Sequence, residues 1–339
     1  MYKRVINTIT VILIIILVSL SFLVGINFTK LSKDFNIGTT YDNDNPPLYR
    51  FMVIIDGSDT SYVKEMELGL SSAALDNGVV YEMWHFAGER KEEEILRQFD
   101  IAIESNVDGI IIQAFDDERL ASVLSKSNYR GVPVTTIGID IPTHEKVSFL
   151  SYNNYAIGSR IGNLLSANFS MEQIKSGTIV LLQDEDNIDQ DKGLAIKEKL
   201  SEEFIVKPIL VNYQGEDTLN AEGVTRSVVN EYDDLVAIIC TTGEETLGVV
   251  QALKETNKIN DVVVIGSEDY QEILEYIERG TVFATVVPDN ERLGYEAITH
   301  LVEYNNGSFV SQYKDIQVNI IEKETIETYI REVGDRFEE

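Results

Sequence analysis

Residues 107–140 read VDGIIIQAFDDERLASVLSKSNYRGVPVTTIGID and predict a strand, a helix and a second strand. The apolar runs at 107–114 and 132–139 are short and rich in β-branched residues, and residues 118–126 between them have helical spacing. Within the runs, apolar residues occupy consecutive positions, which is typical of strands that helices cover on both faces. The stretch therefore predicts a βαβ unit of a parallel sheet.

The same alternation continues on both sides of this unit, from Pro47 almost to the C-terminus. It pauses at VSFLSYNN, residues 147–154, where we expect one lobe to give way to a second. The predicted fold class is α/β, with two doubly wound, Rossmann-like lobes of parallel sheet. The expected strands are 50–56, 79–86, 107–114, 132–139, 147–152, 177–184, 206–213, 235–242, 262–268 and 283–289.

The N-terminal stretch ITVILIIILVSLSFLVGI, residues 9–26, predicts a single transmembrane helix. No charged residue occurs from Val5 to Thr29, a length that can cross a bilayer. Lys3 and Arg4 favour a cytoplasmic N-terminus, so that everything after the helix is extracytoplasmic. We therefore expect an uncleaved anchor at 1–29, a polar tether at 30–47 and a cell-membrane location. The alternative is a signal peptide cleaved near Ser21 or Gly25.

Composition excludes several classes of function. A formal net charge of −29 argues against a nucleic-acid partner, which would require clustered Lys and Arg. The single cysteine, Cys240, cannot form an internal disulfide. The three histidines, His85, His144 and His300, are scattered along the sequence, so we expect no metal site. The fingerprints of nucleotide-binding loops and of hydrolase nucleophiles are absent, so we expect no cofactor and no enzyme. A hydrolase that uses paired carboxylates such as Asp140 is the weaker alternative.

Ligands of open parallel sheets bind beyond the carboxyl ends of the strands. The residues that follow the expected strands are rich in carboxylates, amides and hydroxyls. Many of them also precede a helix, where the same residue types cap the backbone. Each one is therefore a candidate both for ligand binding and for helix capping.

Five segments, in this order, resemble the type I periplasmic sugar-binding proteins, the family that includes the ribose- and xylose-binding proteins of ABC transporters. The segments are VDGIII at 107–112, GVPVTTIGID at 131–140, SYNNYAIGSRIGNLL at 151–165, TLGVVQALK at 246–254 and GTVFATV at 280–286. The resemblance covers roughly residues 48–320. It implies that three crossings, near 151, 287 and 316, join lobe 1 (48–151 and 288–316) to lobe 2 (152–287 and 317–339), and that the lobes close on a ligand by a hinge.

The resemblance also implies a set of ligand-binding residues, which departs from the family pattern in places. Gln190 stands where the family has an arginine, Thr242 begins the pair that replaces its Asn-Asp, and Glu268 ends the triplet that replaces its Gly-Phe-Asp. The remaining candidates are rich in acceptors, which suits a sugar-like polyol, an amino sugar or another cationic ligand. The predicted ligand-binding residues are Asp59, Tyr62 as a stacking aromatic, Gln113, Asp140, Asn154, Gln190, Thr242 and Glu268.

The expected function is that of a membrane-anchored solute-binding protein, and the expected partner is an ABC permease. Some anchored relatives are sensing subunits of two-component histidine kinases, so the resemblance leaves that alternative open. A third alternative is an interaction module whose cleft no longer binds a ligand. An anchor would hold the protein at a high effective concentration next to any membrane partner.

Overall fold

A computed structural model describes residues 36–37, 46–115, 118–169, 177–184, 190–200, 204–211 and 218–333. The anchor predicted at 1–29 and most of the tether at 30–47 lie outside these residues. Within them, no helix has the length and apolar character needed to cross a bilayer. The chain divides into two compact units, which we call unit 1 (Met1–Ser151 with Asn290–Lys314) and unit 2 (Tyr152–Asp289 with Asp315–Glu339). The crossings expected near 287 and 316 lie close to these divisions.

Unit 1 is built on a seven-stranded sheet with the order β1-β3-β2-β4-β5-β6-β12. Strands β2 to β6 pair in parallel, whereas β1 pairs antiparallel to β3. The strand bounds are β1 Asn36–Ile37, β2 Arg50–Asp56, β3 Val80–Phe86, β4 Gly109–Ala114, β5 Val134–Gly138, β6 Ser148–Tyr152 and β12 Tyr313–Ile316.

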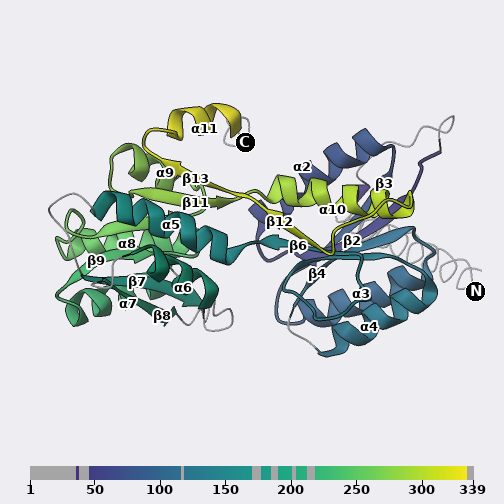
Figure 1. The fold of residues 1–339 in the computed structure, drawn as a ribbon, viewed down its shortest axis with the longest axis horizontal. Helices are drawn as coiled ribbons and strands as arrows, with labels where there is room; N and C mark the ends of the chain where they lie inside the picture. Colours follow the sequence, from purple (N-terminus) through teal and green to yellow (C-terminus); the bar gives the residue numbers. More distant parts are fainter. Residues whose placement is uncertain are drawn as a thin grey trace, which may run out of the picture. The chain divides into compact units, whose positions relative to one another are not determined.

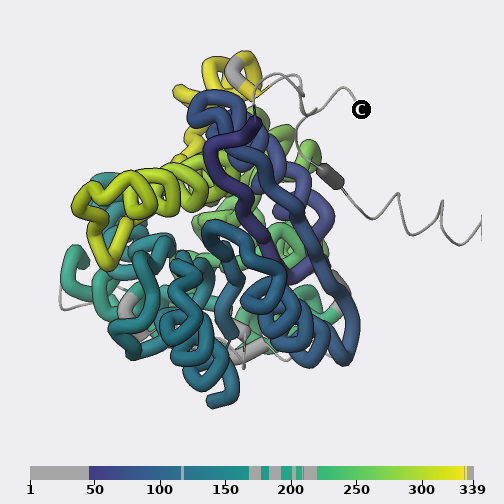
Figure 2. Tube along the Cα trace, turned by 90° about the vertical axis from the view of Figure 1, so that its right-hand side faces the viewer, coloured from purple at the N-terminus to yellow at the C-terminus, as the bar shows by residue number. Residues whose placement is uncertain are grey.

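Two pairs of helices cover the faces of this sheet (Figure 1). Helices α3 (Lys91–Glu104) and α4 (Glu118–Arg130) cover one face, where their apolar side chains pack on Met52, Ile54 and Ile112. Helices α2 (Thr60–Asn77) and α10 (Asn290–Asn305) lie side by side on the other face. In Figure 2, α10 is yellow-green and the early segments of unit 1 are purple and blue. More than half of the chain separates α2 from α10 in the sequence. Unit 1 is therefore completed by a segment from late in the sequence.

Helices α2 and α10 approach each other closely because both carry glycine where they cross. A Cβ on Gly69 would collide with the backbone carbonyl of Glu291, and one on Gly294 would lie 2.5 Å from the carbonyl oxygen of Met66. Helix α2 begins at the N-cap Asp59 and ends at Gly78, whose φ of 62° is in the left-handed region that favours glycine.

Unit 2 contains a six-stranded sheet with the order β13-β11-β10-β9-β7-β8. All of its neighbouring strands pair in parallel except β13, which runs antiparallel to β11. The strand bounds are β7 Gly177–Asp184, β8 Phe204–Val211, β9 Leu235–Ile239, β10 Val263–Ser267, β11 Ala284–Pro288 and β13 Val318–Glu322.

The helices of unit 2 also divide between two faces. Helices α5 (Asn154–Phe169) and α6 (Gln190–Lys199) pack on one face of the sheet and cross each other at Gly158 and Gly162. The other face packs against α7 (Thr218–Glu231), α8 (Gly243–Glu255), α9 (Gln271–Glu278) and α11 (Ile326–Val333). Each unit therefore has one glycine-mediated helix pair on one face of its sheet.

The prediction of two parallel α/β sheets is confirmed. The sequence did not predict the short edge strands β1, β12 and β13 or the last helix, α11. Strand β8 also starts at Phe204 rather than at 206, because Phe204 pairs in register with Gly177 at the start of β7. Strands β1, β12 and β13 are short and lack the long apolar runs of central strands such as β2 and β4.

Candidate functional site

The carboxyl ends of β2 and β4 in unit 1 meet through Asp56 and Gln113. The backbone N–H of Asp56 donates to Oε1 of Gln113 at 3.0 Å, and Lys91 Nζ lies 2.6 Å from Asp56 Oδ2. Burial alone would raise the pKa of Asp56, but hydrogen bonds from Lys91 and Ser58 outweigh it and hold the pKa below its ordinary value. Asp56 is therefore a charged acceptor, and a cation already neutralises it.

Asp59 and Tyr62 lie at the start of α2, directly after β2. Asp59 Oδ1 accepts the backbone N–H groups of Ser61 at 2.8 Å and of Tyr62 at 3.2 Å, so this carboxylate caps the helix. Burial, with Asp56 and Asp59 nearby, raises the pKa of the half-buried Tyr62 phenol, which therefore stays protonated. Tyr62 lies next to the capped turn, and its role as a stacking aromatic stays a prediction.

Asp140 follows β5 and is an exposed carboxylate at this end of unit 1. Its side chain is 59% exposed, and its Oδ1 is 2.6 Å from Nζ of Lys146, whose side chain is only 9% exposed. Gly138 precedes it with a φ of 90°, in the left-handed region, and packs next to the side chain of Gln113. Asp56 and Asp140 thus each have a lysine partner.

In unit 2, Thr242 follows β9 and forms the N-cap of α8. Its hydroxyl accepts the N–H of Glu245 at 3.2 Å, and the carboxylate of Glu245 accepts the N–H of Thr242 at 3.2 Å and that of Thr241. The two residues form a reciprocal capping box, and Glu245 is fully buried. The predicted binding residue Thr242 therefore has a structural role in this turn.

Glu268, at the end of β10, is held in an unusual backbone conformation beside Tyr270. Its φ is 66°, its N–H donates to the carbonyl of Val286, and its own carbonyl accepts the hydroxyl of Thr285 at 2.6 Å. Non-glycine residues with positive φ are uncommon and concentrate at functional sites. These contacts thus fix the backbone position from which the Glu268 side chain extends.

Tyr270 is the centre of the polar cluster at this end of unit 2. Its hydroxyl donates to Oε1 of Glu244 at 2.8 Å, and Glu268 also contacts it. Burial and then the two carboxylates raise the pKa of the phenol far above its ordinary value. The ring can approach because Gly243 has no Cβ; a Cβ there would lie 2.7 Å from both the Tyr270 ring and the Glu268 carboxylate. Tyr270 follows β10 and belongs to the polar residues expected at the strand ends, but it is not among the predicted ligand-binding residues.

Two predicted residues begin helices of unit 2. Asn154 is the first residue of α5 and is exposed, whereas the preceding Asn153 makes the cap, accepting the N–H of Ala156 at 2.9 Å. Gln190 is the first residue of α6, and its side chain lies outside the described part. The structure therefore gathers Asp59, Tyr62, Gln113 and Asp140 at one end of the sheet of unit 1, and places Thr242 and Glu268 together in unit 2.

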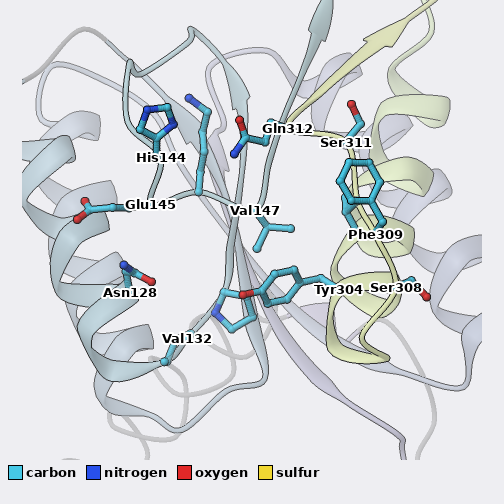
Figure 3. Close-up of a pocket in the computed structure, with 14 residues that line it drawn as sticks. Asn128, Val132, His144, Glu145, Val147, Tyr304, Ser308, Phe309, Ser311 and Gln312 are labelled. Carbon is cyan, nitrogen blue, oxygen red and sulfur yellow. The ribbon is translucent and has the colours of Figure 1, made fainter.

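A hollow of about 640 Å³ lies at the opposite end of the unit 1 sheet, where β5 and β6 begin. Figure 3 shows Asn128 and Glu145 on one side of it and Tyr304 and Phe309 on the other, with Val147 between them. None of the predicted ligand-binding residues lines this hollow.

The described residues contain no group of three or more His, Cys, Asp or Glu side chains that could hold a metal ion. Cys240 is buried, and burial raises the pKa of its thiol well above the ordinary value. This thiol therefore belongs to the core of unit 2.

Comparison with known proteins gives a family match over most of the chain. Residues 51–308 match the model of the periplasmic binding protein domain. The ABC transporter periplasmic-binding protein YphF of Escherichia coli (strain K12) is 23% identical over 231 residues, which are 67% of this chain and 71% of that protein.

Many solved structures share the fold, including the following two. The sugar-binding protein of a sugar ABC transporter from Bacillus halodurans aligns with a TM-score of 0.72 and 22% identity, over 83% of this chain and 99% of that one. The XylFII–LytSN complex aligns with a TM-score of 0.67 and 24% identity, over 82% of this chain and 99% of that one.

Proposed function

The chain belongs to the periplasmic binding protein family, and we propose that it is an extracytoplasmic solute-binding protein for a sugar or a sugar-like compound. The family consists of binding proteins, so the expectation that the chain is not an enzyme is confirmed by its membership. The observation that supports the ligand class is the set of polar side chains at the strand ends of each unit. The similarity to a sugar-binding protein of an ABC transporter favours the same class.

The side chains of the two units suggest what the ligand offers. In unit 2, Glu244 and Glu268 supply carboxylate oxygens around Tyr270, and in unit 1 the lysine-paired Asp56 and Asp140 supply more acceptors. Acceptors in this number suit a ligand rich in hydroxyl or ammonium donors. A polyol, an aldose or an amino sugar meets that requirement, and an anionic sugar does not.

Ligand-induced stabilisation tests the proposal. Purified full-length protein would be heated with D-ribose, D-xylose, D-allose, ribitol, D-glucosamine and D-glucuronate in separate samples. A ligand that binds only the folded state stabilises it by about 2.7 kcal/mol when its concentration is one hundred times Kd. Tm therefore rises with ligand concentration. We expect at least one neutral or amino sugar to raise Tm and D-glucuronate to leave it unchanged.

Two variants locate the binding site. Glu268→Gln keeps the size of the side chain and removes its charge, and should weaken binding of the active compound. Glu278→Gln makes the same change at an exposed position near the other end of α9 and should leave binding unchanged. If no compound of the panel changes Tm and native mass spectrometry finds no bound small molecule, the proposal is wrong.

We propose that the partner is an ABC permease and that the N-terminal segment anchors the protein in the cell membrane. A sensor histidine kinase is the second candidate, which the similarity to the XylFII–LytSN complex favours. Membrane fractionation with N-terminal sequencing tests the anchor, because a mature N-terminus beyond Gly25 and a protein free in the medium would exclude it. Crosslinking in intact cells, followed by mass spectrometry, distinguishes a permease from a kinase.

A further inference from the structure

A network of polar side chains, three of them buried, joins α10 to its neighbours in unit 1, away from the strand ends that we assign to the ligand. It consists of Ser148, Glu296, His300 and Lys314, with Arg292 at its edge, and we call it the α10 network. Ser148 is 0% exposed, Glu296 5% and His300 6%. Buried ionisable groups are costly unless they are paired, so their retention in a core requires a reason.

The contacts of the α10 network join three elements. Nδ1 of His300 lies 3.0 Å from Oγ of Ser148 on β6, and Nε2 of His300 lies 3.7 Å from Oε2 of Glu296, one turn earlier in α10. Nζ of Lys314 on β12 lies 3.4 Å from the same Oε2. Arg292 pairs with the other oxygen of Glu296. Glu296 thus connects α10 to β12, and His300 connects α10 to β6.

These three elements are the ones through which the chain passes from one unit to the other. Strand β6 ends at Tyr152, where unit 2 begins, and α10 begins at Asn290, where the chain returns to unit 1. Lys314, in β12, is the last residue of unit 1 before the third crossing. The α10 network therefore fastens together the unit 1 ends of all three connections.

Among the members of the α10 network, His300 is the one whose ordinary pKa lies near neutral pH. Arg292 and Lys314 already compensate the single carboxylate of Glu296, so protonation of His300 would add a third cation to a buried site. It would also turn both ring nitrogens into donors, so the hydroxyl of Ser148 could only accept from Nδ1. Glu303 on α10 is a further carboxylate near the ring, and Glu65 and Asp76 of α2 bind Asn290 and Tyr295 of the same helix.

We propose that the α10 network is a pH-sensitive tie, which fixes the three connecting elements to one another while His300 is neutral and loosens them together when His300 is protonated. The proposal concerns unit 1 alone and does not depend on the identity of the ligand. In an extracytoplasmic protein it would make the connections between the units respond to external pH.

The direction of the effect follows from the burial of His300. Burial lowers its pKa below the ordinary value of 6.5, outweighing the carboxylates of Glu296 and Glu303, which raise it. When the α10 network is open, His300 is in contact with water and binds a proton more readily than in the closed network. Acid therefore favours the open state. The stabilisation is complete above the ordinary pKa and is lost as pH falls below it.

Hydrogen exchange followed by mass spectrometry tests the proposal on the purified full-length protein between pH 7.5 and pH 5. We expect protection factors, corrected for the intrinsic rate, to fall in peptides covering 148–152, 290–300 and 313–316. The fall should reach at most about tenfold per pH unit, the limit for one linked proton. In His300→Gln this pH dependence should disappear, and in the matched control His144→Gln, at an exposed position, it should remain.

A second measurement keeps the test valid if His300→Gln does not fold. The chain has only three histidines, so the NMR resonance of His300 can be assigned by elimination with His85→Gln and His144→Gln. Its titration midpoint should coincide with the midpoint of the exchange change. The proposal is overturned if the midpoints differ, if only one of the three segments responds, or if the response persists in His300→Gln.

Discussion

Carboxylates lie at the strand ends of both units, but the groups that pair with them differ. In unit 1, Asp56 and Asp140 each lie 2.6 Å from the ammonium group of a lysine. In unit 2, Glu244 and Glu268 surround the neutral phenol of Tyr270. One scaffold therefore presents a charge-balanced edge in unit 1 and an acceptor-rich edge in unit 2.

The scaffold beneath these edges is alike in the two units, and the largest effects are expected there. Gly69→Ala should destabilise unit 1 and Gly158→Ala unit 2, because each new Cβ would collide with the carbonyl oxygen of the crossing helix, that of Glu291 or of Lys192. Overpacking against backbone costs about 1–3 kcal/mol and sometimes more. Differential scanning calorimetry should show a lower Tm for both variants.

A matched substitution separates this steric effect from the general effect of adding a methyl group to a helix. Gly223 in α7 is exposed, and a Cβ there would meet no atom within 4 Å. Gly223→Ala should therefore stabilise the protein by up to about 1 kcal/mol, through helix propensity. If Gly69→Ala or Gly158→Ala behaved like Gly223→Ala, the close crossings would not be a shared feature of the two units.

The helix caps at the two edges provide the next comparison. Glu245→Ala removes a fully buried acceptor from the N–H groups of Thr241 and Thr242 and should cost about 2–3 kcal/mol. Asp59→Ala removes an exposed cap and should cost about 1 kcal/mol. Urea unfolding of both variants measures the difference.

A conservative variant checks that Asp59→Ala loses stability because it removes the helix cap, and not because it removes a charge. Asn accepts the same backbone N–H groups, so Asp59→Asn should stay close to the wild type in free energy of unfolding. Equal losses in Asp59→Ala and Glu245→Ala would contradict the difference in burial between the two caps.

The sequence predicts the scaffold better than the site because scaffold and site depend on different distances along the chain. Apolar runs such as GIII in β4 are local, and they identified both sheets. The capping box of α8 was also visible as Thr242-Gly-Glu-Glu245, a local signal that assigns Thr242 to the cap.

Other features of the site depend on contacts that the sequence alone does not place. The pairing of Asp56 with Lys91 requires β2 and the start of α3 to meet, and no local pattern identifies lysine as the partner. The approach of Tyr270 to Glu244 depends on the missing Cβ of Gly243, on another loop. Residue type and position after a strand predicted the set of candidates but not how they pair.

Removing the donor that binds a carboxylate at each edge gives the third prediction, with effects near 1 kcal/mol. Lys91→Met leaves the half-buried carboxylate of Asp56 without its cation, and Tyr270→Phe leaves Glu244 without its phenol donor. Each should lower the free energy of unfolding at pH 7 by about 1 kcal/mol.

Salt distinguishes the two losses. Added salt screens an ion pair near the surface more than a hydrogen bond to a neutral phenol, with a Debye length of about 3 Å at 1 M. The cost of Lys91→Met should therefore shrink when urea unfolding is repeated in 1 M NaCl, while the cost of Tyr270→Phe should persist. The same salt dependence in both variants would remove the electrostatic difference between the units.

The smallest effect concerns acid stability and tests the edge of unit 1 alone. Lys91 and Ser58 hold the pKa of Asp56 below its ordinary value of 3.8 in the folded chain, despite burial, which acts in the opposite direction. The unfolded chain then binds the proton more readily, so the stabilisation from Asp56 is present above pH 3.8 and is lost as pH falls through the folded pKa. Because both side chains of this pair retain some contact with solvent, the contribution should be below about 1 kcal/mol.

Lys91→Met removes the main cause of the lowered pKa of Asp56. Its curve of stability against pH, measured by urea unfolding, should therefore be flatter than that of the wild type below pH 4. In Tyr270→Phe this acid limb should be the same as in the wild type, because Asp56 keeps its lysine; parallel curves for the wild type and Lys91→Met would show that the cation does not control the charge of this edge.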